Sequence, residues 1–148
     1  MISQIDSPHP VDVTFGEKEL SERQQRILGE LPGFGSQAIV KKRDVSMLDL
    51  AALTAKTGDE FAMFTRKGDR LIIRGNFLSV PLTPNKAEKL RSEGYRWSGH
   101  THIGINDESL IASDGDRKVL KAFNQSKSLI YNAAGKHAFV KQVIKNVP

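Results

Sequence analysis

The order of helix signals and strand signals along the chain is the feature that most constrains its fold. Ser46 and Asp49 form an S-x-x-D capping pattern and Gly58 closes the apolar stretch that follows, so we predict a helix over residues 46–58. Residues 59–82 (DEFAMFTRKGDRLIIRGNFLSVPL) hold three short β-rich runs separated by KGD and GN turns. Helices and strands therefore do not alternate in a fixed unit, which favours an α/β (α+β) fold with helices flanking one mixed sheet.

The rest of the chain contains further helix and strand signals in mixed order. Thr83 is the expected N-cap of a second helix, Pro84 its first residue, and Gly94 lies just past its end. The remaining elements that we predict are strands over 37–42, 95–102, 128–135 and 137–144, and a third helix over 116–125.

Residues 1–35 differ from the remainder, and we predict an N-terminal extension with one helix there. Leu20, Ile27 and Leu31 have near-helical spacing and precede a Pro-Gly stop. Residues 36–148 then form the main domain. A chain of 148 residues, 39% of them hydrophobic, is long enough to bury one core.

Composition narrows the function classes. The net charge is +5, with Lys and Arg spread among acids, which only weakly favours an acidic partner. There is no membrane-length apolar run and no secretory signal pattern, so we expect a cytoplasmic protein, or one exported without a cleaved signal. Because the chain has no cysteine, any bound metal must take His, Asp, Glu or water as ligands.

Two of the four histidines lie one residue apart in the predicted strand YRWSGHTH. Alternation along a strand would turn Tyr95 and Trp97 to one face and His100 and His102 together to the other. The two imidazoles would be roughly 6 to 7 Å apart along the backbone, a span that two rings can close on one ion. The alternative is one ordinary surface or core histidine beside another.

Asp116 is the candidate third ligand, because it begins the third predicted helix and can be aimed back at the histidines. Two histidines and one carboxylate leave the fourth position of a tetrahedral zinc ion for water, as in catalytic zinc sites. The alternative is that Ser113 and Asp116 only form a capping box. A residue at a helix start can do both.

The residues H100-T-H102 and S113-D-G-D116, on a strand and a helix of a mixed α/β chain, resemble the motif of the JAB/MPN (JAMM) zinc metalloprotease family. The resemblance extends from about residue 36 to the end of the chain. It implies a mixed β-sheet flanked by helices, with a cytidine-deaminase-like architecture. It also implies a Zn²⁺-dependent hydrolase of peptide or isopeptide bonds, acting on a protein or peptide substrate, ubiquitin-like proteins included.

The resemblance also implies roles for individual residues. Ser113 would help to hold the tetrahedral intermediate, and Glu60 would be the catalytic acid that the family keeps upstream, with Asp59 as its neighbouring alternative. The zinc ligands would be His100, His102 and Asp116.

The chain departs from the family pattern at two points. Ile103 stands where the family has Pro, and the loop from His102 to Ser113 is longer than the common spacing. Loops tolerate such insertions at small cost. They leave Asp107 and Asp114 as alternatives to Asp116 for the third ligand.

Other function classes fit less well. A calcineurin-like metallophosphoesterase would need D-x-H, G-D-x-x-D and G-N-H-D/E motifs, which this chain lacks. A nucleic-acid binder is disfavoured because no Arg and aromatic platform is present. A non-catalytic MPN-like scaffold and a module of a secreted bacterial toxin or effector remain open.

Overall fold

Six strands form one mixed sheet in the computed structural model, which describes residues 19–142 of the chain. Their order across the sheet is β1-β3-β2-β4-β5-β6, and every neighbouring pair is antiparallel except β4 and β5, which are parallel. The strands are β1 (Gln37–Lys41), β2 (Phe61–Arg66), β3 (Asp69–Arg74), β4 (Arg96–Thr101), β5 (Lys127–Tyr131) and β6 (His137–Lys141). The predicted fold class, a mixed sheet flanked by helices, is confirmed at this level.

Two of the predicted helices begin at their predicted N-caps. Ser46 and Thr83 are the N-caps of α3 (Met47–Thr57) and α4 (Pro84–Ser92), and Gly58, with φ of 76°, ends α3 in the left-handed conformation. The third predicted helix starts earlier than expected, because Ser113 is its N-cap and α5 spans Asp114–Ala122. The remaining helical segments are α2 (Glu22–Gly29) and the 3₁₀ turns η1 (Lys42–Asp44) and η2 (Asp107–Leu110).

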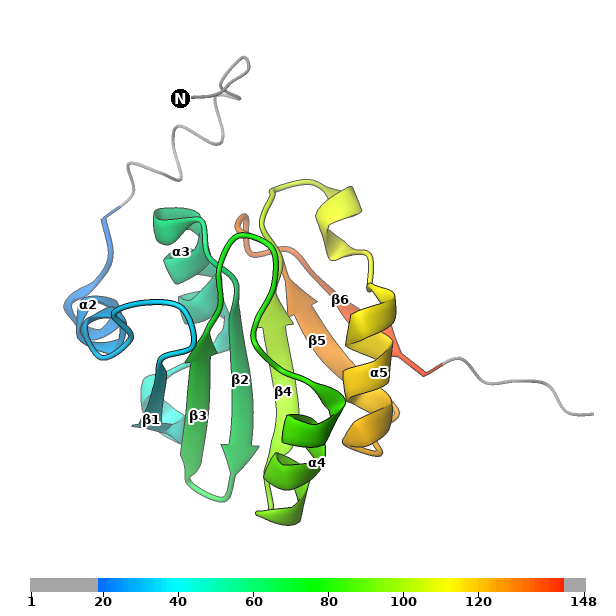
Figure 1. Ribbon diagram of the computed structural model, residues 1–148. Coiled ribbons are helices and arrows are strands. Elements are labelled where there is room, and N and C mark those ends of the chain that lie inside the picture. Colours follow the sequence, from blue (N-terminus) through cyan, green and yellow to red (C-terminus); the bar gives the residue numbers. More distant parts are fainter. Residues whose placement is uncertain (1–18, 143–148) are drawn as a thin grey trace, which may run out of the picture.

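The two faces of the sheet are covered by different helices. In Figure 1, α4 and α5 lie over one face and α3 over the other. Strand β2 shows why both faces are apolar: Phe61 and Met63 pack with α2 and α3, while Ala62 and Phe64 pack with α4 and α5. A strand buried on both sides is a continuous apolar run, as FAMF is.

One strand prediction is wrong. The third β-rich run of residues 59–82 forms no strand: after β3 ends at Arg74, residues 75–82 form a turn and an extended connection to α4. Several of these apolar residues line a cleft. A hydrophobic pattern alone does not distinguish residues that line a cleft from residues of a buried strand.

Smaller differences occur near the C-terminus. The strand predicted over 128–135 ends at Tyr131, because Asn132 to Gly135 form the turn before β6. The last predicted strand is β6 as far as Lys141, and its residues 143 and 144 lie outside the described residues, as do residues 1–18 of the predicted extension. No helix within residues 19–142 is long and apolar enough to cross a membrane.

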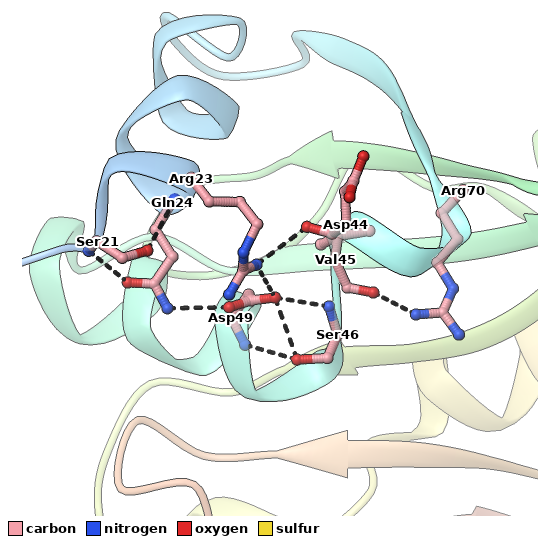
Figure 2. Close-up of polar contacts among 8 residues, drawn as sticks. All are labelled: Ser21, Arg23, Gln24, Asp44, Val45, Ser46, Asp49 and Arg70. Carbon is pink, nitrogen blue, oxygen red and sulfur yellow. Dashed lines mark hydrogen bonds and ion pairs between the residues drawn. The ribbon is translucent and has the colours of Figure 1, made fainter.

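A buried carboxylate joins α2 to α3, as Figure 2 shows. Asp49 accepts hydrogen bonds from Arg23 (2.5 Å), from Gln24 (3.0 Å) and from the backbone N–H of Ser46 (2.8 Å). Burial alone would raise the pKa of Asp49, but these donors outweigh it and hold that pKa below its usual value. Ile27 and Leu31, from the segment predicted as an extension, lie in the same apolar cluster as α3.

Candidate metal centre

A β-bulge in β4 sets the direction of the candidate ligands. Phe64 pairs with Trp97 and Met63 pairs with Gly99, so Ser98 is an extra residue without a partner on β2. The prediction that Trp97 faces away from His100 is therefore wrong: the two rings stack at a centroid distance of 5.0 Å. The bulge shifts the alternation by one residue, as such irregularities often do beside functional sites.

His100 and His102 do point together, as predicted. Their Nε2 atoms lie 3.0 Å apart, although His102 follows the last residue of β4 and does not belong to the strand. Between them, Thr101 faces the opposite side, where its hydroxyl accepts a hydrogen bond from the backbone N–H of Phe61 (2.9 Å) and contacts the Thr54 hydroxyl (2.6 Å).

Asp116 completes the cluster from the first turn of α5. One carboxylate oxygen lies 3.1 Å from Nε2 of His100 and the other 3.2 Å from Nε2 of His102. Two ligand atoms of a tetrahedral zinc ion, each at about 2.0 to 2.1 Å from it, lie about 3.3 Å apart. The three side chains present their ligand atoms within 4.8 Å of one another, so the group is compatible with a metal site.

Electrostatics favour the ionised form of Asp116. Its burial raises the pKa of the carboxyl, but hydrogen bonds with His100 and His102, and one from the backbone N–H of Ser113, hold that pKa well below its usual range. Burial lowers the pKa of His102, and the same carboxylate outweighs that effect and raises it. The position in the first turn of a helix also suits a negative charge.

The ring of His102 has a defined orientation. Its Nδ1 lies 3.0 Å from the backbone carbonyl oxygen of Ser109, and a carbonyl only accepts, so Nδ1 carries a proton. In the neutral ring, Nε2 is then the bare nitrogen, which is the form that binds a metal. The long loop after His102 supplies this carbonyl through η2.

The alternative acids point elsewhere. The Asp114 side chain is 89% exposed and pairs with Arg117 at 2.8 Å, and the Asp107 side chain is 90% exposed and lies 3.8 Å from Lys136. Asp59 pairs with Arg74 at 2.8 Å. The structure thus brings Asp116, and neither Asp107 nor Asp114, to the histidines.

Glu60 lines the same cleft as the three candidate ligands. Burial raises the pKa of its carboxyl to about 8, while the charge of His102 acts to lower it and that of Asp116 to raise it. An opposite charge nearby favours the ionised form of a carboxyl, so a cation bound at the three candidate ligands would lower the pKa of Glu60. Its backbone is fixed, since its N–H donates to the carbonyl of Asn76 (2.9 Å) and its carbonyl accepts from Gly75 (2.7 Å).

Ser113 also lines the cleft, and the capping box predicted for its motif is present. Its Oγ accepts a hydrogen bond from the backbone N–H of Asp116 (3.0 Å), and its own N–H donates to the Asp116 carboxylate (3.0 Å). This capping box also holds the carboxylate that faces the histidines. Within residues 19–142 the Ser113 hydroxyl accepts this one hydrogen bond and donates none.

The cleft has a volume of about 460 Å³ and includes residues that the sequence reasoning missed. Trp97 lines it, and so do Phe77, Leu78, Ser79, Val80 and Leu82. Only the apolar character of residues 77–82 gave a signal, which was interpreted as a strand. No protein-family model, curated protein or solved structure matches this chain.

Proposed function

We propose that the protein is a zinc-dependent hydrolase of peptide or isopeptide bonds. The observation that carries this proposal is the convergence of His100, His102 and Asp116 in a cleft that also contains Glu60. Two imidazole nitrogens and one carboxylate oxygen fit zinc, and three protein ligands correspond to a catalytic site with an open position. The resemblance to the JAB/MPN motif supports the same chemistry.

Metal binding, proton transfer and stabilisation of the intermediate fall to different residues. His100, His102 and Asp116 would hold the ion, which when bound lowers the pKa of water to about 7 and polarises a carbonyl. Glu60 takes the proton of the attacking water and returns it to the leaving amine. Ser113 donates a hydrogen bond from its hydroxyl to the oxyanion of the tetrahedral intermediate.

The test separates metal binding from chemistry. Elemental analysis of the purified protein is expected to find one zinc per chain, and His100→Ala and His102→Ala are expected to lose it. Glu60→Gln is expected to keep the zinc and lose cleavage of a mixed peptide library. Asp114→Asn is the matched control and should retain both, because its side chain points away from the group.

Two results would contradict the proposal. A wild-type protein that takes up no zinc would remove the metal centre. Zinc uptake without cleavage of peptides or isopeptide-linked conjugates would instead favour a non-catalytic MPN-like scaffold.

A further inference from the structure

Large apolar side chains stand exposed at the mouth of the cleft. Eight large hydrophobic residues among the described ones are exposed, and three of them line this cleft: Phe77 (65%), Leu78 (70%) and Ile103 (36%). We call these three residues the apolar rim. Scattered exposed hydrophobics are ordinary, but a group of them around a concave site marks a binding surface.

The part of the rim at Phe77 and Leu78 is built as a tight turn. The side-chain oxygen of Asn76 accepts hydrogen bonds from the backbone N–H groups of Leu78 (2.9 Å) and Ser79 (3.0 Å). The backbone N–H of Asn76 donates to the carbonyl of Ser79 (2.9 Å). A Cβ at Gly75 would lie 2.1 Å from the Ser79 carbonyl oxygen, so only glycine fits there. The two exposed side chains therefore have a fixed backbone.

This turn is attached to the proposed catalytic carboxylate. Glu60 exchanges backbone hydrogen bonds with Asn76 (2.9 Å) and Gly75 (2.7 Å), so Phe77 and Leu78 keep a constant position relative to Glu60. Ile103 follows His102 directly and brings a third apolar group next to a proposed ligand. A substrate whose scissile bond reaches Glu60 and the histidines must pass these side chains.

The charges of the cleft exclude one class of ligand. Among the described residues that line it, the acids are Glu60 and Asp116, and there is no Lys or Arg. An acidic side chain at the rim would lose water without gaining a Lys or Arg partner, since the proposed cation lies among His100, His102 and Asp116 and not at the rim. The basic net charge of the chain thus does not extend to this cleft.

We propose that the apolar rim selects substrates with a large, uncharged apolar side chain next to the scissile bond, and that the cleft rejects acidic side chains there. This inference rests on the proposed function. The occupant is the substrate itself, because the rim borders the residues that the reaction requires and presents apolar side chains with no Lys or Arg in the lining of the cleft.

The test uses zinc-loaded protein and three hydroxamates whose zinc-binding group is the same: N-acetyl-leucine, N-acetyl-glycine and N-acetyl-glutamate hydroxamate. By calorimetric titration the wild type is expected to bind the leucine compound at least tenfold more tightly than the glycine compound, and the glutamate compound most weakly. The double variant Phe77→Ser, Leu78→Ser is expected to bind the glycine compound unchanged and to lose the preference for leucine. Phe34→Ser is the control, since Phe34 is 59% exposed and does not line the cleft.

The outcomes are distinguishable from failure of the proposed function. Equal affinities for the three compounds in the wild type, or an unchanged preference in the double variant, would overturn the role of the rim while leaving the zinc site standing. A double variant that changes only the oligomeric state would assign the rim to a subunit contact and would also overturn it. A wild type that binds no zinc would overturn the proposed function and this inference together.

Discussion

The Nδ1 atom of His102 lies 3.0 Å from the carbonyl oxygen of Ser109, and this contact turns the opposite nitrogen of the ring to the candidate metal centre. Ser109 donates hydrogen bonds to the carbonyl of Asn106 and packs closely against Gly104. This glycine has φ of 110°, and a Cβ there would lie 2.9 Å from the Cβ of Ser109. The backbone of Gly104 is in turn bonded to Ala133, whose N–H donates to its carbonyl at 2.8 Å.

We therefore expect Gly104→Ala to displace Ser109 and weaken zinc binding. Loss of such an outer hydrogen-bond partner typically costs about 10–100-fold in metal affinity. Competition with a zinc-chelating dye measures the change. Gly35→Ala is the control, since its positive φ of 82° also strains an alanine while nothing lies within 4 Å of its Cβ position. Equal zinc affinities in the two variants would remove Ser109 as a positioning residue.

Ser113→Ala tests the second function of the α5 N-cap. We expect a loss of about 1 kcal/mol in the free energy of unfolding, as for other N-caps, together with about 10²-fold lower kcat at unchanged zinc content. Ser46→Ala removes the equivalent cap of α3 and is expected to lose stability without losing kcat. Urea unfolding and turnover of the same preparations give the two readouts. A kcat of Ser113→Ala equal to that of Ser46→Ala would restrict Ser113 to capping.

Thr101→Val is expected to destabilise the centre of the sheet. Valine has nearly the shape of threonine but leaves the buried N–H of Phe61 without its acceptor. An unsatisfied buried donor costs about 1–3 kcal/mol. Thr54→Val removes only the hydroxyl contact to Thr101 and should cost less. Chemical denaturation of both variants decides the order, and the reverse order would contradict the assigned role of Thr101.

The Asp49 carboxylate predicts a pH dependence of stability. Because its pKa in the folded protein is below the unfolded value of about 3.9, it stabilises the fold above about pH 4, and this contribution is lost as the pH falls through the folded pKa. Asp49→Asn should cost about 1–3 kcal/mol at pH 7, and the difference from the wild type should shrink below pH 3. Urea unfolding of the wild type and of Asp49→Asn at pH 7 and below pH 3 measures this difference.

Asp69→Asn is the control for this pH effect. Asp69 is half-buried in β3 and makes no ion pair or side-chain hydrogen bond within residues 19–142. Its substitution should leave the pH dependence as in the wild type. A difference between wild type and Asp49→Asn that stays constant from pH 7 to pH 2.5 would exclude ionisation of Asp49 as the source.

The helix ends and the candidate ligands could be predicted because their signals are local. The caps at Ser46 and Thr83 depend on residues within one turn, and the pair of histidines depends on spacing alone. The position of Trp97 could not be predicted in this way. It depends on a bulge that exists only in the pairing of β4 with β2.

The same limit applies to the apolar segment after β3. Its hydrophobic residues have the composition of a strand, but the glycine at Gly75 and the Asn76 side chain turn the chain away from the sheet. Likewise, a backbone carbonyl such as that of Ser109 leaves no mark in the sequence. The sequence therefore predicted which candidate metal ligands come together, and not which residues surround them.

The extra residue Ser98 lets Trp97 and His100 share one face of β4 although they are three positions apart in the sequence. Without Ser98, Trp97, Gly99 and His100 would pair with Phe64, Met63 and Ala62 in regular alternation, so both imidazoles would still face the cleft and Thr101 the Thr54 side. A deletion at this one position should therefore keep metal binding, and a relative that lacks the bulge would reach the same arrangement with one residue fewer between its tryptophan and its first histidine.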